Sequence, residues 1–563
     1  MGFTRTKVTR KEMLGLGLLG SAALFLPFER KARTQLSIAD RIPESQLPKP
    51  FQVPFVVPPV AQRVPGPDPG TDYYVMRMQA KPLQILPGYG PTTIYGYDGV
   101  TPGPTIHARQ GRRVVVRHIN ELPDVSFANY KTWTSVHLHG SASKPQYDGY
   151  ASDITNPGQY KDYHYPNIQP ARTLWYHDHG VHHTAENAYM GCAAQYHLHD
   201  EQELSLPIPH GAYDASGNFV PSKYDAPLIL RDAIFAKDGS FVYDDQGHSS
   251  LFGDVILTNG RPWPVMKVER RKYRFRVLNA SLSRSYRLAL STGDANLTVI
   301  GHDGGLAPAP VSVTNMRVGQ AERYEIVIDF SRYKAGQQVV LKNLSNPNNQ
   351  DYASTGQIMR FDVESSTGDP NNNQIPSVLN AGIGEKYNPM QLKQTDATGQ
   401  AKLEVIRTNG LWTVNGQTWE DVIASDYKKV VANPGLDQVQ VWELKNPSGG
   451  WFHPLHIHLI DFKILSRNGK PPLPHEQGPK DVAYLGENET VKVIARFGPQ
   501  EGRYMVHCHN LVHEDHDMMV QFRVGPDKEL NGQTDPNDPV EAAKAQNTPF
   551  GDLPPLPPPE PQV

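Results

Sequence analysis

Four short histidine clusters constrain this chain more than any other feature of its 563 residues. They read HLHG from His137, WYHDH from Trp175, HPLHIH from His453 and HCHNLVHEDHDMM from His507, and they supply ten candidate histidine ligands and one cysteine. One such cluster is weak evidence in a chain with 22 histidines. Four of them, the last built around a cysteine, indicate bound copper and chemistry on dioxygen.

Strand parity predicts how the two C-terminal clusters divide. Residues two apart on a β-strand point to the same face of the sheet. If residues 507–509 are extended, their two histidines share one face and Cys508 lies on the other. His456 and His458 share a face in the same way, and His453 has the opposite parity.

Parity therefore gives two groups of candidate ligands. The first contains Cys508 and His453, followed closely by His513 and Met518; two histidines, a thiolate and a distant thioether form a blue-copper electron-transfer site. The second group has eight imidazoles, too many for one ion and suited to a cluster of about three. Its members are His137, His139, His177, His179, His456, His458, His507 and His509. The backbone of residues 507–509 joins the two groups covalently.

Neither zinc nor the remaining histidines account for these clusters better. Structural zinc sites are rich in cysteine, and this chain has two cysteines in all. His197 and His199 in QYHLHDEQE repeat the H-x-H spacing, but no glycine follows them, and we interpret this pair as structural. Three further histidines flank the clusters and are expected to support ligands or face solvent: His182, His183 and His516.

The four clusters, in this order and spacing, resemble those of the multicopper oxidases, which include laccases, ascorbate oxidase and bilirubin oxidase. The similarity extends over roughly residues 90 to 525. It is greatest toward bilirubin oxidase in GGWFHPLHIHLIDFKILSR and HCHNLVHEDHDMMVQF, while KYRFRVLNASLSRSYRLAL resembles both bilirubin oxidase and bacterial spore-coat laccases. These motifs are specific for the family and much less specific for the substrate.

This resemblance implies four copper ions, one of type 1, one of type 2 and two of type 3. The type 1 copper would be bound by His453, Cys508, His513 and Met518, with Met519 as the rival axial ligand. The type 2 copper would take His137 and His456, one type 3 copper His139, His177 and His509, and the other type 3 copper His179, His458 and His507.

The composition predicts an all-β fold. The chain has 50 prolines and 47 glycines, and runs such as RRVVVRHIN and YEIVIDF are typical of strands. A strand that ends in an asparagine turn recurs near residues 115, 275 and 442, which, with the resemblance, predicts three cupredoxin-like Greek-key β-sandwich domains. We expect them at residues 46–205, 206–385 and 386–530. Ligands occur only in the first and third, so the cluster should lie between these two.

The two ends of the chain depart from this pattern. Residues 1–45 hold basic residues followed by a 16-residue apolar run from Met13 to Phe28, short for a spanning helix and typical of a signal sequence. TRKEML, from Thr9, resembles a twin-arginine signal with lysine in the second basic position. We expect an extracytoplasmic protein with no transmembrane domain after export. Residues 531–563 form a proline-rich tail, expected to be extended polyproline without fixed structure.

Charge and cysteine content limit the partners. With a formal net charge of −3 and no basic stripe, nucleic acid is not an expected partner. With Cys508 assigned to copper only Cys192 remains, so no intrachain disulfide is expected. The expected partners are dioxygen and small aromatic reductants, and the sequence carries no signal of oligomeric state.

The resemblance implies an oxidoreductase of the laccase or bilirubin oxidase type, which oxidises phenolic or aromatic donors one electron at a time and reduces dioxygen to water. Asp148 in YDGY and Glu514 match carboxylates that assist proton delivery in the spore-coat laccases; otherwise they are structural carboxylates. Trp451 shares the parity of His453 and matches a tryptophan of bilirubin oxidase, so it is expected at the substrate edge of the type 1 site, unless it is a core indole. Two alternatives stay open: a Cu(I), Fe(II) or Mn(II) oxidase, and a non-catalytic copper-binding coat protein.

Overall fold

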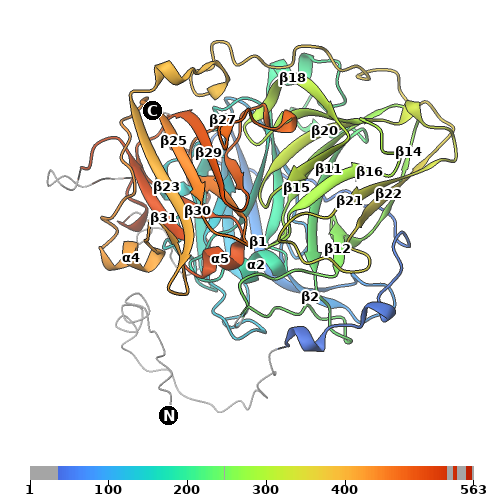
Figure 1. The fold of residues 1–563 in the computed structure, drawn as a ribbon, viewed down its shortest axis with the longest axis horizontal. Coiled ribbons are helices and arrows are strands. Elements are labelled where there is room, and N and C mark those ends of the chain that lie inside the picture. Colours follow the sequence, from blue (N-terminus) through green and yellow to red (C-terminus); the bar gives the residue numbers. More distant parts are fainter. Residues whose placement is uncertain (1–35, 246–247, 529–534, 536, 542–552, 561–563) are drawn as a thin grey trace. The chain divides into compact units, whose positions relative to one another are not determined.

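Strands dominate the structure, a computed structural model that describes residues 36–245, 248–528, 535, 537–541 and 553–560. The strands form three successive pairs of sheets, so the three β-sandwiches predicted from the sequence are present (Figure 1). The twin-arginine-like motif and the apolar run of the expected leader lie outside the described residues. Among the described helices, none has the length and apolar character needed to cross a membrane.

The first sandwich pairs the sheet β2-β1-β4-β6 with the sheet β3-β8-β7-β5. β-Branched and aromatic residues, which favour strands, fill the core between them, as Val114 and Val116 of β4 do. Its strands are β1 (Thr71–Leu83), β2 (Thr92–Tyr97), β3 (Ile106–Arg109), β4 (Arg113–Glu121), β5 (Val136–His139), β6 (Tyr160–Tyr165), β7 (Arg172–Asp178) and β8 (Ala193–His199). Its helices, with two turns that precede it, are η1 (Ile38–Asp40), η2 (Glu44–Gln46), η3 (Pro145–Tyr147), α2 (Thr184–Met190) and α3 (Glu201–Ser205).

The second sandwich pairs a seven-stranded sheet, β13-β12-β11-β15-β20-β17-β18, with a five-stranded one, β14-β22-β21-β16-β19. A short hairpin, β9 (Ala212–Tyr213) and β10 (Phe219–Val220), precedes it. Its elements are β11 (Asp225–Ala233), β12 (Val255–Thr258), β13 (Arg261–Pro262), β14 (Val265–Val268), β15 (Lys272–Asn279), β16 (Tyr286–Leu290), β17 (Leu297–His302), β18 (Gly305–Val313), β19 (Asn315–Val318), β20 (Arg323–Asp329), η4 (Phe330–Arg332), β21 (Gln338–Asn343) and β22 (Gln357–Val363).

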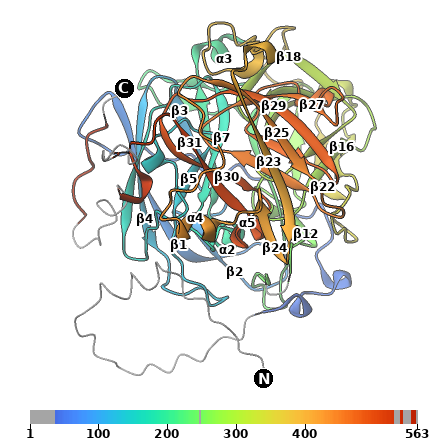
Figure 2. The same cartoon turned by 60° about the vertical axis from the view of Figure 1, so that its left-hand side comes forward.

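The third sandwich pairs the sheet β24-β23-β25-β29-β27 with the sheet β28-β26-β30-β31. Figure 2 shows the third sandwich next to the first, and the two meet where His139 on β5 stacks on His456 on β26. Its elements are η5 (Pro389–Gln391), η6 (Gln394–Asp396), β23 (Gly399–Thr408), β24 (Leu411–Val414), α4 (Trp419–Ala424), β25 (Val439–Asn446), β26 (His453–Ile457), β27 (Phe462–Arg467), η7 (Pro474–Glu476), β28 (Val482–Leu485), β29 (Glu489–Arg496), β30 (Gly502–Cys508), α5 (Leu511–Asp515) and β31 (Met519–Val524).

Residues 553–560 of the proline-rich tail lie against the first sandwich. The Arg117 guanidinium donates hydrogen bonds to the carbonyls of Pro554 and Pro555, and the Glu560 carboxylate accepts one from Lys144 at 2.6 Å. Proline offers carbonyl acceptors but no N–H donor, so a guanidinium is a suitable partner. The expected lack of fixed structure therefore does not hold for this part of the tail, which is free of helix and strand but held in place.

Candidate metal centre

Two antiparallel strand pairs bring the four clusters together. β5 pairs with β7 so that His137 lies opposite His177, and β26 pairs with β30 so that His456 lies opposite His507. Direct pairs on one face of a ladder place their side chains in contact. Each of the two outer sandwiches therefore contributes one ladder of histidines.

The strand β30 separates its ligands between two faces, as the parity argument predicts. Cys508 points to the side of His453, whose Nδ1 is 3.4 Å from the Cys508 sulfur. His513, on helix α5, completes this group with Nδ1 3.6 Å from the same sulfur. The three side chains are buried and could bind one ion.

The neighbouring methionines point to different places. Met518 belongs to the same buried cluster as Cys508. Met519, one residue later, packs with Tyr150 and Met505 in a different cluster. Of the two candidate axial ligands, Met518 is therefore the one on the cysteine side of the sheet.

The eight remaining imidazoles converge on the other side of the same strands. His507 is central, with its Nε2 3.2 Å from Nε2 of His179 and 3.1 Å from Nε2 of His458. Elsewhere in the group, His139 stacks on His456 with ring centroids 3.7 Å apart, and the rings of His177 and His509 lie 5.3 Å apart. All eight side chains are buried, and they form overlapping trios that could each hold an ion.

Backbone and carboxylate acceptors fix the orientation of these rings. The Nδ1 atoms of His177 and His456 donate to the carbonyls of Asp178 and Asp481, at 2.7 and 2.9 Å. With that proton on Nδ1, the Nε2 atoms of both rings are unprotonated, and in the structure they are buried without a hydrogen-bond partner. Unpartnered imidazole nitrogens aimed at one another are the donor set that copper requires, so the residues fit this metal.

Burial sets the protonation state of His453 and Cys508. It lowers the pKa of His453 to about 3, so this imidazole is neutral at pH 7 and able to bind a metal. Burial also raises the pKa of the Cys508 thiol, which keeps the sulfur protonated in the metal-free chain. A bound cation reverses this order, because it deprotonates a coordinating thiol.

Three buried carboxylates support the histidines. Glu514 has one carboxylate oxygen 2.8 Å from Nδ1 of His507 and the other 3.4 Å from Nδ1 of His179. Asp148 accepts from Nδ1 of His458 at 2.8 Å. Such contacts orient imidazole ligands and raise their basicity.

The third of these carboxylates, Asp481, connects all three sandwiches. It lies 3.2 Å from Nε2 of His139, and it receives a hydrogen bond of 2.6 Å from Arg323 on strand β20. The second sandwich thus reaches the site through this arginine and through Asp303, which accepts from the backbone N–H of Asp481 at 3.1 Å. Neither Asp481 nor Arg323 was identified from the sequence, because no local motif marks them.

Gly149 permits the close approach of Asp148 to the histidines. Its φ is +74°, and a Cβ at this position would lie 2.6 Å from the backbone of His137. Any other residue would therefore push the segment that carries Asp148 away from strand β5.

Two tryptophans lie next to the cysteine-containing group. The ring of Trp412 stacks on His513 at 3.9 Å and lies 5.3 Å from that of His453. Trp451 is half-buried and packs edge-on against Trp412 and His513, at 5.1 and 5.6 Å. Trp451 precedes β26 and is not part of a strand, so parity with His453 does not set its direction. The sequence analysis missed Trp412, because no histidine motif lies near it in the chain.

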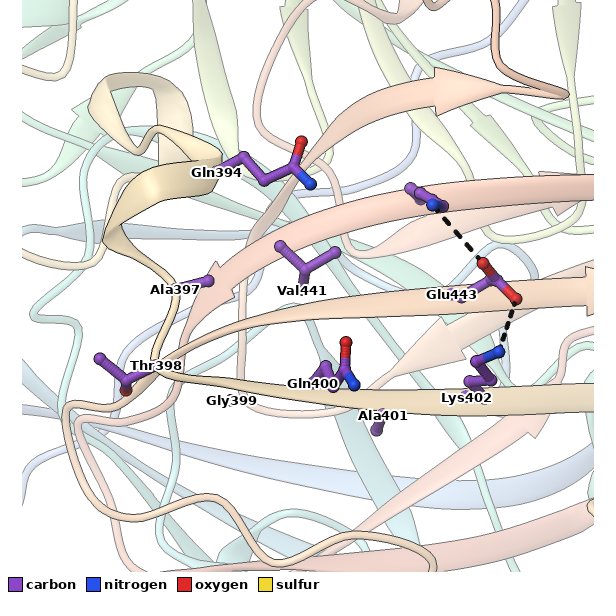
Figure 3. A pocket seen from close by; sticks show the side chains of 10 residues that line it. Gln394, Ala397, Thr398, Gly399, Gln400, Ala401, Lys402, Val441 and Glu443 are labelled. Atoms are coloured by element: carbon purple, nitrogen blue, oxygen red, sulfur yellow. Dashed lines mark ion pairs between the residues drawn. The ribbon is translucent and has the colours of Figure 1, made fainter.

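The histidines that flank the clusters have other partners. His182 is half-buried and lies 3.2 Å from Glu420, and His183 packs on Trp133 with ring centroids 4.4 Å apart. Cys192 is a buried free thiol. A pocket of 480 Å³ lies apart from all of these, on the third sandwich, where Lys402 and Lys492 form ion pairs with Glu443 (Figure 3). It has no ligand or redox side chain of the kinds described above.

Comparison with known families identifies the class of protein. Three family models, each described as multicopper oxidase, match residues 79–203, 216–360 and 389–528. The chain therefore belongs to the multicopper oxidase family, as its histidine clusters predicted.

Individual relatives agree with this assignment. The chain is 40% identical to a bilirubin oxidase of Albifimbria verrucaria, over 90% of this chain and 88% of that protein. It is 32% identical to a laccase of Bacillus subtilis strain 168, over 79% of this chain and 93% of that protein. Among solved structures, McoA multicopper oxidase from Aquifex aeolicus superposes with a TM-score of 0.72 at 27% identity, covering 84% of this chain and all of that one.

Proposed function

We propose that this protein is a four-copper oxidase that removes single electrons from phenolic or other aromatic donors and reduces dioxygen to water. His453, Cys508, His513 and Met518 would hold the type 1 copper. The type 2 copper would be held by His137 and His456, one type 3 copper by His139, His177 and His509, and the other by His179, His458 and His507. The trio His179, His458 and His507 is one of the compact groups in the structure.

One observation carries this proposal: the segment 507–509 places a thiolate in one ligand group and two imidazoles in the other. The two groups lie on opposite sides of strand β30 and are buried. A site that accepts single electrons is thereby joined by covalent bonds to a site large enough for several ions. Bound copper would supply one-electron transfer at the first group and the reduction of dioxygen at the second.

The chain must relay, from solvent to the site, the protons that the reduction of dioxygen consumes. Imidazoles that bind metal through Nε2 keep their Nδ1 proton in a hydrogen bond, so they cannot release it freely. Glu514 and Asp148 touch the Nδ1 atoms of His507 and His458 at 2.8 Å each. Burial raises the pKa of Asp148, which suits a group that must hold a proton for part of each cycle.

The aromatic pair Trp451 and Trp412 forms the donor side of the proposed type 1 site. Trp412 is buried against His513, and Trp451 is half-buried over it. A half-buried indole offers a flat surface for aromatic donors, and the inner indole excludes water from the imidazole edge. The names of the relatives, bilirubin oxidase and laccase, support donors of this class.

Export to an extracytoplasmic compartment belongs to the same proposal. It rests on the basic and apolar character of residues 1–45. Fractionation of the native host, with this protein followed by antibody, tests it.

The activity is tested by measuring oxygen uptake and peroxide with a panel of donors. The panel contains a phenol, bilirubin, Fe(II), Mn(II) and Cu(I). We expect one dioxygen consumed for every four electrons supplied by the aromatic donors, with no peroxide released. Uptake driven by the metal ions and by none of the aromatic donors would instead assign the protein as a metal oxidase, and no uptake with any donor would assign a copper-binding protein.

A further inference from the structure

A second group of histidines lies in the first sandwich, apart from the proposed copper ligands. It consists of His107 on strand β3 and of His197 and His199 on strand β8. β3 runs parallel to β8 with His107 in register with His197. On the ladder between β7 and β8, His177 pairs with Ala193 at one end and Thr173 pairs with His197 at the other, so the two groups occupy opposite ends.

The three rings converge closely enough to share one ion. Their ligand nitrogens all lie within 4.8 Å of one another, and Nδ1 of His107 is 3.0 Å from Nε2 of His199. A tetrahedral zinc ion with Zn–N distances of about 2.0–2.1 Å separates its ligand nitrogens by roughly 3.3 Å. The spacing of the pair therefore needs little change to accept such an ion.

A buried carboxylate fixes the ring of His199. Nδ1 of His199 donates to Glu203 at 2.8 Å, which leaves Nε2 as a lone pair directed at His107. This is the carboxylate–histidine arrangement found behind metal ligands. In the metal-free chain Nδ1 of His107 carries the proton of its hydrogen bond to His199. A bound ion would take the place of this proton, which would move to Nε2 of His107.

The surrounding charges tolerate a cation. Glu203, Asp225 and Glu325 form buried ion pairs with Arg274 and Arg276. Three carboxylates against two guanidinium groups leave one negative charge in excess. A dication bound by the histidines would therefore lie near a net negative charge and not near a net positive one.

An aromatic ring covers this group of histidines, yet one of the three is partly exposed to solvent, so an ion could enter and leave. Phe219 of the β9–β10 hairpin stacks on His199 at 3.9 Å and on His107 at 4.5 Å. His197 and His199 are buried, whereas His107 is half-buried. An ion would therefore enter past His107.

We propose that His107, His197 and His199 bind one divalent transition-metal ion of the zinc class, with Glu203 holding His199 and water completing the coordination. Three imidazoles without a thiolate suit zinc and its neighbours. The ion would tie β3 to β8 and to helix α3. This site revises the interpretation of His197 and His199 from the sequence, where the third member, 90 residues earlier, was not visible.

The test is equilibrium dialysis of tag-free, copper-loaded protein against Zn²⁺ at pH 7.5, with zinc and copper both measured. We expect wild type to bind one zinc that His107→Gln and His199→Ala bind at least tenfold more weakly, with copper content unchanged. Glutamine at position 107 keeps a hydrogen-bonding group toward His199 at a half-buried site, so this variant should fold even if His199→Ala does not. Zinc should also raise the melting temperature of wild type and not that of His107→Gln.

His164→Gln provides the matched control, because His164 is also half-buried but belongs to neither group. It should bind zinc as wild type does. The proposal is overturned if wild type and His107→Gln bind equal zinc, if His164→Gln loses zinc as well, or if zinc enters only as copper leaves. In each case the three rings are a hydrogen-bonded structural cluster.

Discussion

Replacing Glu514 by glutamine changes the site at two imidazoles simultaneously. One carboxylate oxygen lies 2.8 Å from Nδ1 of His507, and the other lies 3.4 Å from Nδ1 of His179. Both rings direct Nε2 toward the shared centre, where these atoms are 3.2 Å apart, so both Nδ1 atoms carry protons. An amide has one acceptor, so its NH2 group must face one of these N–H donors.

The magnitude follows from that lost acceptor. A hydrogen bond to a charged group contributes about 1.5–3 kcal/mol. Loss of the group that orients a metal-bound histidine lowers metal affinity about 10–100-fold, or about 1.4–2.8 kcal/mol, so the two estimates agree. Glutamine also cannot carry a proton near neutral pH, and a positioned proton carrier accelerates a reaction by about 10²–10⁴-fold. We therefore expect weaker copper binding and a loss of turnover of about 100-fold or more.

Three measurements separate these effects in protein reconstituted with excess copper. Copper content after dialysis against a chelator should fall faster in Glu514→Gln than in wild type. The rate at which an aromatic donor bleaches the blue band without oxygen should be unchanged, because the Glu514 carboxylate faces His507 and His179 and not the cysteine-containing group. The loss of turnover should appear in steady-state oxygen uptake.

Asp148→Asn serves as the comparison. One oxygen of Asp148 accepts from His458. The other lies 3.5 Å from Nδ1 of His137, whose proton goes to the backbone carbonyl of Asp148, so an asparagine amide removes no acceptor on which that N–H depends. This variant should retain copper like wild type and still lose turnover. If oxygen uptake by Glu514→Gln stays within a factor of two of wild type from pH 5 to pH 8, Glu514 is a structural carboxylate and Asp148 is the better candidate for proton delivery.

Three further substitutions test separate parts of the account. His456→Ala should keep the blue colour but lose oxygen reduction, because His456 lies on the far side of the sheet from Cys508. Visible spectra and oxygen uptake check this. Loss of colour with normal oxygen uptake would reverse the assignment of faces. Trp451→Ala should change kcat and KM for large aromatic donors more than for ferrocyanide, and an equal response would mean that the residue acts on the copper or on packing. Burial raises the pKa of Glu476, but Arg467 and Arg317 outweigh it and lower this pKa to about 2. A carboxyl group whose pKa is lowered by folding contributes its full stability above its unfolded pKa of 4.5. Glu476→Gln should therefore destabilise the protein by about 3–5 kcal/mol near pH 7, and its deficit in melting temperature should shrink as pH falls from 4.5 toward 2. A deficit independent of pH would refute the ion pair.

The sequence was informative wherever chemistry is concentrated in short motifs. Strand parity separated Cys508 from its flanking histidines because side chains alternate along any extended segment, whatever its surroundings. Parity does not apply to Trp451, which lies in a loop, although this residue does pack against His513. It also could not find Trp412, Asp481 or Arg323, since each reaches the site by packing between segments far apart in the chain.

The same limit explains two features that the sequence did not reveal. The proline-rich tail has the composition of an unstructured segment, yet Arg117 of the first sandwich provides donors for its carbonyls. His197 and His199 gave no sign of a third partner, because parallel pairing of β3 and β8 supplies His107 from another part of the sequence. Both depend on which strands become neighbours, and local patterns do not encode this.

The central claim is that Cys508 binds a type 1 copper that is joined to a three-copper cluster. The most direct measurement is the copper content and visible spectrum of wild type and Cys508→Ser, prepared side by side with excess copper. The account predicts four coppers and an intense blue band in wild type, and three coppers without the band in the variant, because serine cannot supply the thiolate charge transfer. A serine variant that keeps the blue band, or a wild type that binds a single copper, would contradict it.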